Sequence, residues 1–159
     1  VKTLEEPLDF VVTTNAGAPL DCNLYQTAKG LSGVSGATRE GGVILIATEC
    51  LEGFGSEEYR AVFEHATTPA EFIEKLMKKE FFMPDPWCAQ ETYQVMLKNE
   101  VWVYTHGIDA ETLKRFHFKP VEKLNDAIDQ LLRRFGNDAR WAIVPDGPML
   151  ILRVAEEGL

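Results

Sequence analysis

One run of the chain, VILIAT at residues 43–48, restricts the fold more than any other stretch. It is continuous and rich in β-branched side chains, and it follows the turn-forming pair Gly41-Gly42. A strand that is apolar at every position has no face to offer to water, so other layers must cover it on both sides. We therefore expect a central strand in a sheet that lies between helices.

Weaker strand patterns recur along the chain, and helical patterns separate them. Strands are predicted at 9–14, 43–48, 101–105 and 141–144, with short extended pieces at 117–120 and 149–154. Helices are predicted at 21–34, 56–64, 67–79, 87–99, 109–116 and 121–135, with a break at 81–86, FFMPDP. This alternation predicts a three-layer, Rossmann-like α/β fold, with a doubly wound, mostly parallel sheet of about four to five strands and helices on both faces.

Composition narrows the class of protein further. The 159 residues are 45% hydrophobic, which suits one domain; residues 1–8 are predicted to be a linker or lead-in, and 9–159 a single α/β domain. The net charge of −9 argues against nucleic acid as a partner but does not forbid a small anionic substrate. No apolar run is long enough for a membrane span. Three cysteines stand far apart without a CxxC pair, which favours a reducing cytoplasm.

The stretch 11–30, VVTTNAGAPLDCNLYQTAKG, carries the main site prediction. A strand, a loop with Asn15 and Gly17, and a helix N-terminus follow one another, which is the commonest ligand site of an α/β sheet. Gln26 and Lys29 are three residues apart and share one helical face. With the unpaired N–H groups of a first turn capped by Asp21, an ammonium and an amide can hold a carboxylate and a neighbouring hydroxyl. The alternative is a solvated helix face.

A second glycine-containing loop follows the strand at 43–48. Gly53, Gly55 and Ser56 lie between this strand and the next helix, where they form either a plain turn or an anion cradle that lines the same cleft. The loop lacks the third glycine of a dinucleotide fingerprint and the Lys-Ser/Thr ending of a P-loop. A nicotinamide-dependent Rossmann enzyme is therefore disfavoured.

The remaining candidates are an aromatic residue and the histidines. Trp87 and Gln90 stand three apart at a helix start and are candidates for an aromatic wall and an amide beside the cleft, although core packing is the more common role of a tryptophan. His65, His106 and His117 share no metal-ligand spacing. His106 follows a strand directly, where a site residue is expected, but a lone histidine is more often structural.

Read together, these segments resemble a known family. NAGAPLD at 15–21 and LYQTAKG at 24–30 are similar to the start of the C-terminal domain of nickel-pincer lactate racemases. Supporting matches follow in the same order along the chain, at 41–45, 50, 53–56, 87, 90, 136–139 and 145–147. The chain differs from the family at Ala16 and Ala18, where members often carry a glycine and an aromatic residue.

The resemblance implies a fold, an activity and separate roles for two domains of the enzyme. Enzymes of this family racemise or epimerise 2-hydroxy acids: nickel, held by a thiolated pyridinium mononucleotide, takes a hydride from C2 while histidine bases deprotonate the hydroxyl. The cofactor and the bases belong to a larger N-terminal domain that this sequence does not include. By the match, Gln26 and Lys29, with Tyr25 beside them, are the substrate contacts of the closing domain. The chain alone is then expected to be inactive and to bind no nickel.

Two hypotheses remain open from the sequence. The first is the substrate-closing domain of a nickel-dependent 2-hydroxy-acid racemase or epimerase in the cytoplasm, whose partners are a small 2-hydroxy carboxylate and the cofactor-binding domain. The second is a stand-alone α/β module that binds small anions or regulates without catalysis. Sequence upstream of Val1 in the parent reading frame separates them.

Overall fold

Five parallel strands form the main sheet of the computed structural model, which describes residues 1–65, 68–78 and 87–155. The break predicted at 81–86 lies outside the described residues. The strand order is β5-β4-β3-β2-β6, with neighbours paired in parallel throughout. The strands are β2 (Leu8–Thr14), β3 (Thr38–Ala47), β4 (Glu100–Tyr104), β5 (Lys119–Val121) and β6 (Trp141–Val144). The mostly parallel α/β fold predicted from the sequence is confirmed.

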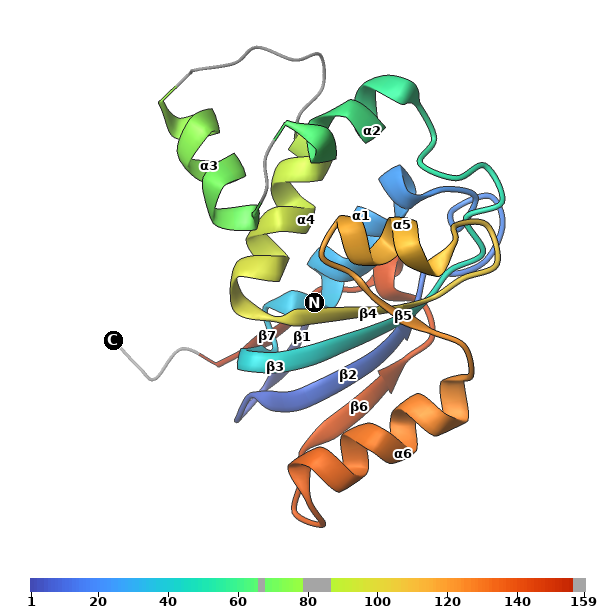
Figure 1. Cartoon of the computed structure of the whole chain (residues 1–159). Coiled ribbons are helices and arrows are strands. Elements are labelled where there is room, and N and C mark those ends of the chain that lie inside the picture. The colour runs from blue at the N-terminus through green and yellow to red at the C-terminus, as the bar shows by residue number, and fades with distance from the viewer. Residues whose placement is uncertain (66–67, 79–86, 156–159) are drawn as a thin grey trace.

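Helices cover both faces of this sheet, but unequally. Figure 1 shows α1 to α5 on one side of the sheet and α6 on the other. The first group comprises α1 (Leu24–Ser35), α2 (Glu57–Glu64), α3 (Pro69–Met77), α4 (Trp87–Lys98) and α5 (Ala110–Arg115); α6 spans Leu124–Phe135. Each side has its own apolar core, a large one under the first group and a smaller one under α6.

The VILIAT run is the centre of the sheet, as predicted. The side chains of residues 43–46 have no exposed area, because β2 and β4 flank β3 and apolar layers cover both of its faces. The strand begins earlier than predicted, at Thr38, and its register against β2 shifts between the pairs Leu8–Thr38 and Phe10–Val43. Gly42 belongs to this irregularity, since a Cβ there would lie 2.7 Å from the carbonyl oxygen of Asp9.

Local sequence signals set several element ends correctly. Thr68 accepts a hydrogen bond from the backbone N–H of Glu71 and caps α3, whose first residue is Pro69. Ser56 caps α2 in the same way. Gly136 ends α6 with a φ of 83°, in the region that favours glycine.

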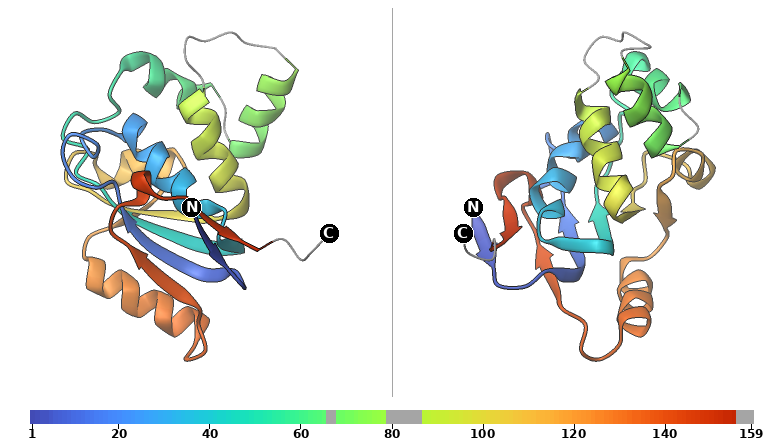
Figure 2. Two further views of the ribbon diagram at one scale, coloured as in Figure 1. Left: turned by 180° about the vertical axis from the view of Figure 1, so that it is seen from behind. Right: turned by 90° about the vertical axis from the view of Figure 1, so that its left-hand side faces the viewer.

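Two terminal segments differ from the prediction. Within the lead-in predicted at 1–8, β1 (Lys2–Leu4) pairs in parallel with β7 (Leu152–Val154), and β2 already begins at Leu8. The edge strand predicted at 149–154 therefore does not extend the main sheet. A 3-10 turn, η1 (Gly147–Met149), leads the chain over α1 first, and Figure 2 shows the resulting two-stranded sheet beside the main one.

The half-buried carboxylate of Asp9 gives the fold a pH dependence. Burial raises the pKa of Asp9, but hydrogen bonds from the backbone N–H of Arg140 (2.8 Å) and the guanidinium of Arg39 (2.6 Å) outweigh burial and hold that pKa below its usual value. A carboxyl whose pKa is lowered on folding stabilises the fold above its unfolded pKa, and this contribution is lost as the pH falls through the folded pKa.

We therefore expect Asp9→Asn to cost about 1 kcal/mol at pH 7 and progressively less as the pH is lowered from about 5 to 2. Urea denaturation across that range measures the difference in free energy of unfolding. A difference that stays constant with pH would contradict the assignment.

Candidate functional site

The N-terminus of α1 is already satisfied by the protein itself. Its cap is Asn23, not the predicted Asp21, and the Asn23 side chain accepts from the backbone N–H of Gln26 at 3.0 Å. The N–H groups of Leu24 and Tyr25 donate to carbonyl oxygens of the 53–54 segment, at 2.9 and 3.3 Å. The sequence-based prediction of unpaired first-turn N–H groups is therefore wrong, and a ligand here must bind through side chains.

Those side chains are present on the outer face of the same helix. The Lys29 ammonium donates to the side-chain oxygen of Gln26 at 2.6 Å, and this bond is exposed to solvent. An ammonium has three hydrogens and this bond uses one, so Lys29 retains donors for a ligand. The two residues thus present a cation and an amide side by side, at the spacing that the sequence predicts.

An aromatic group stands next to this pair. The Tyr25 ring meets the rings of Tyr59 and Trp87 edge to face, with centroid separations of 5.2 and 6.1 Å. Tyr59 is buried, whereas 48% of Trp87 is exposed, so Trp87 is not a core residue. The structure therefore brings together four predicted site residues from α1 and α4: Tyr25, Gln26, Lys29 and Trp87.

Asn15 has a structural position and does not line a cleft. It is completely buried; its side-chain oxygen accepts from the backbone N–H of Gly30 at 3.2 Å, and its amide nitrogen donates to the carbonyl of Leu20. Gly30 is required for this contact, because a Cβ there would lie 2.6 Å from the Asn15 oxygen. The neighbouring Gly17, with a φ of 72°, is exposed and shapes the loop only.

The 53–56 segment turns its amides inward. Gly53 and Gly55 have positive φ values, and their N–H groups donate to the carbonyls of Cys50 and Glu52. Ser56 is occupied by capping α2. Of the two alternatives, the plain turn therefore describes this loop, and these glycine N–H groups form no anion cradle. The segment does border a surface hollow of about 370 Å³, where Arg60 lies among acidic side chains.

The usual nucleotide crevice of such a sheet is filled. In open α/β sheets that crevice opens where the strand order reverses, here between β2 and β6. Gly147 occupies this point so closely that a Cβ would lie 2.6 Å from the Thr13 hydroxyl and 3.1 Å from Gly30. Asn15 and Asp146 also form a bridge across it. The filled crevice agrees with the absence of a dinucleotide fingerprint.

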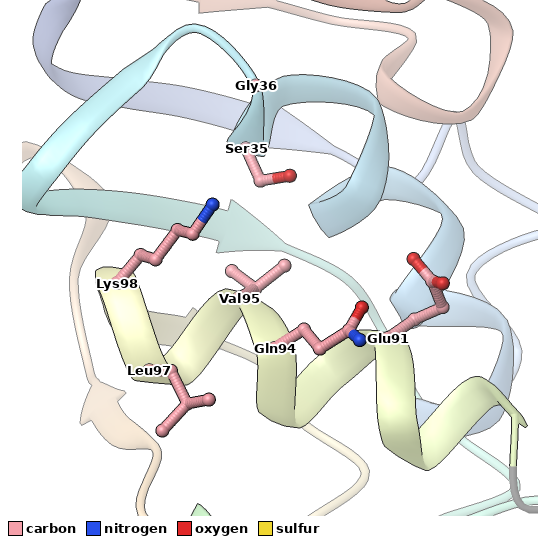
Figure 3. A pocket seen from close by; sticks show the side chains of 7 residues that line it. All are labelled: Ser35, Gly36, Glu91, Gln94, Val95, Leu97 and Lys98. Atoms are coloured by element: carbon pink, nitrogen blue, oxygen red, sulfur yellow. The ribbon is translucent and has the colours of Figure 1, made fainter. Parts of the chain in front are cut away.

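A polar groove between the C-terminal halves of α1 and α4 was not predicted from the sequence. It has a volume of about 410 Å³, and Ser35, Gln94 and Lys98 line it. Figure 3 shows Lys98 extended toward the Ser35 end of α1 and Gln94 lying along α4 toward Glu91, with Leu97 turned away. Nearer the Tyr25 end, the Ser32 hydroxyl donates to Glu91 at 3.0 Å. No local motif marks these residues, because only the packing of the two helices brings them together.

His106 lies at the carboxyl end of β4, where the sequence places it. Its Nδ1 is 3.0 Å from the carboxylate of Glu49, which follows β3, and its Nε2 is 3.3 Å from the hydroxyl of Tyr104. Sequence reasoning missed both partners, although each stands at or just past a predicted strand end. Within the part of the chain that the structure describes, no three His, Cys, Asp or Glu side chains are grouped so as to hold a metal ion.

Comparison with known proteins gives a consistent result. The family model for the lactate racemase C-terminal domain matches residues 3–152. Lactate racemase from Thermoanaerobacterium thermosaccharolyticum is 32% identical over 150 residues, which are 93% of this chain and 35% of that protein. Lactate racemase from Lactiplantibacillus plantarum is 26% identical over 147 residues, which are 91% of this chain and 35% of that protein. The chain thus spans about a third of the length of these relatives.

Solved structures are similar over almost the whole chain. The apoprotein of lactate racemase from T. thermosaccharolyticum superposes with a TM-score of 0.84 at 32% identity, covering 93% of this chain and 36% of the other. A crystal structure of a Thermotoga maritima protein superposes with a TM-score of 0.63 at 16% identity, covering 97% and 39%. The second likeness shows the fold alone.

Proposed function

The chain belongs to the family of lactate racemase C-terminal domains, and from that premise we propose that it is the substrate-closing domain of a nickel-dependent 2-hydroxy-acid racemase or epimerase. One observation carries the proposal beyond the family. Lys29 and Gln26 meet at 2.6 Å on the exposed face of α1, and Tyr25, the residue before Gln26, contacts Trp87. A cation, an amide and an aromatic edge match the parts of a small 2-hydroxy carboxylate.

In this proposal each side chain has a separate task. The Lys29 ammonium binds the substrate carboxylate through a charge-assisted hydrogen bond, and Gln26 holds the adjacent hydroxyl or the second carboxylate oxygen. Tyr25 and Trp87 contact the carbon skeleton and exclude water when the site closes. The domain therefore binds and orients the substrate, which is where its contribution to the rate arises.

The cofactor and the catalytic bases are assigned to the rest of the enzyme, a larger N-terminal domain. The described residues of this chain offer no cluster suited to a nickel ion, so we assign no metal ligand here and derive no step through the nickel-pincer nucleotide. We further propose that the α/β domain predicted at 9–159, together with β1 and Leu8, forms one domain of a cytoplasmic enzyme. None of Cys22, Cys50 and Cys88 forms a disulfide in the described structure, which suits a reducing compartment. None of the described helices has the length and apolarity to span a membrane.

Binding of lactate to the isolated chain tests the substrate contacts. We expect D- and L-lactate to bind with a Kd of roughly 10 mM, since half a site gives low affinity, and to shift the NMR signals of Gln26 and Lys29. Lys29→Met should remove these shifts. Lys114→Met is the matched control, because Lys114 is also an exposed lysine paired with a residue three positions earlier.

The same titration separates the two hypotheses. Propionate lacks the 2-hydroxyl, so the closing domain should bind it more weakly than lactate, whereas a general anion-binding module should bind both alike. Equal binding of the two acids, or shifts confined to the hollow at 52–60, would contradict the proposal. We also expect no racemisation and no nickel in the purified chain, and stoichiometric nickel in a metal assay would contradict the assignment of the metal to another domain.

A further inference from the structure

We propose that a hollow at the carboxyl ends of β4 and β5 is a second binding site, one that takes a small primary amine with a short alkyl chain. The hollow has a volume of about 240 Å³ and is bordered by Tyr104, His106 and Glu122. It is formed by residues other than those of the Gln26–Lys29 pair, and the inference does not rest on the proposed racemase function.

The backbone around His106 is fixed from both sides. The Thr105 hydroxyl and the Gly107 N–H both donate to the carbonyl oxygen of Glu49, at 2.7 and 2.9 Å. Gly107 must lack a side chain, because a Cβ there would collide with the carbonyl group of Cys50. His106 thus stands between two residues that the Glu49 carbonyl anchors.

Each nitrogen of the His106 ring has a side-chain partner, and the two contacts fix the orientation of the ring. Nδ1 faces the Glu49 carboxylate at 3.0 Å, which selects the tautomer with hydrogen on Nδ1, and Nε2 then accepts from the Tyr104 hydroxyl at 3.3 Å. The side chains of His106 and Glu49 are 61% and 46% exposed, so water screens their attraction and the pair adds little to stability. His106 therefore orients the Tyr104 hydroxyl, and both side chains border the hollow, where the Tyr104 oxygen can still accept a hydrogen bond from a ligand.

The lining of the hollow indicates which ligand fits. Its floor is apolar, with Val103, Ile108, Leu113 and Val121 from three neighbouring elements and the loop between them. Among the described residues that line it, Glu122 carries the full charge, and Glu49 adds a second carboxylate behind His106. An alkyl chain can lie on the floor while its ammonium donates to the Tyr104 oxygen, which His106 orients, and to Glu122. An anion would face the Glu122 carboxylate, and none of the described residues that line the hollow is a lysine or an arginine.

An NMR titration of the whole chain with n-butylammonium chloride tests this site. We expect millimolar binding with shifts at Tyr104, His106 and Val121, and no binding of butyrate. His106→Gln and Glu122→Gln should each weaken binding at least about five-fold. Glu111→Gln is the matched control, an exposed acidic residue on α5 outside the hollow. Retention of the dispersed spectrum shows that each variant is folded.

The outcomes are distinct. Butyrate or n-butanol binding as tightly as butylammonium would overturn the proposal, and so would unchanged binding by His106→Gln and Glu122→Gln. Tighter binding of Nα-acetyl-lysine methylamide than of butylammonium would support the chemistry and identify a protein side chain as its source. Lys29→Met should leave butylammonium binding unchanged, so failure here and failure of the racemase proposal are separable.

Discussion

Gly107→Ala should destabilise the protein by about 3 kcal/mol or more, the largest effect that we expect from a single added methyl group. The new Cβ would collide with the carbonyl group of Cys50 and lie 2.7 Å from the backbone nitrogen of Leu51. Both are backbone atoms, so neither can rotate away as a flexible side chain can. Cys50 is itself completely buried and has a positive φ of 50°, which leaves the turn little freedom to shift.

The displacement would spread to the predicted substrate helix. Cys50 donates to the carbonyl of Asp21 and accepts from Gly53, and the 53–54 carbonyls accept the first N–H groups of α1. Urea denaturation measures the loss, with Gly17→Ala as the control. A Cβ at Gly17 meets no atom within 4 Å, so that variant should lose only about 1 kcal/mol from its φ of 72°. Equal losses in the two variants would contradict the close packing of the turns after β3 and β4.

Lys29→Met should lower kcat/KM about 100-fold in a complete two-domain enzyme while leaving the fold intact. Loss of a charge-assisted bond to a substrate carboxylate costs roughly 2–3 kcal/mol of transition-state binding, which corresponds to that factor. Lys29 is exposed and donates to the side chain of Gln26 on the same helix, so the free energy of unfolding should change by less than about 0.5 kcal/mol. The variant therefore separates substrate binding from stability.

Structural features that depend on residues close in the sequence could be predicted, whereas features that depend on distant residues could not. The VILIAT strand, the Thr68 and Ser56 caps and the Gly136 helix end depend on neighbouring residues, and the structure confirms them. The cap of α1, in contrast, depends on Cys50, a residue distant in the sequence. The carbonyl of Asp21 accepts from Cys50 instead, so the cap lies two residues later, at Asn23, and the helix begins at Leu24.

The candidate site likewise combines contacts between residues close in the sequence with contacts between distant residues. Gln26 and Lys29 lie on one helix face, so their three-residue spacing predicts their contact. Asn15 is buried because Gly30 lies against it, fifteen residues away, and Glu49 reaches His106 across 57 residues. No local pattern contains those separations. The fold was therefore easier to predict than the roles of the loop residues.

Racemisation by a grafted two-domain enzyme tests the central claim most directly. This chain would replace the matching third of T. thermosaccharolyticum lactate racemase, to which it is 32% identical with a TM-score of 0.84, and the cofactor would be loaded before assay. We predict interconversion of D- and L-lactate or of another 2-hydroxy acid, about 100-fold slower in kcat/KM for Lys29→Met and unchanged for Lys114→Met. Activity that is the same with Lys29→Met, or with the grafted third removed, would contradict the account.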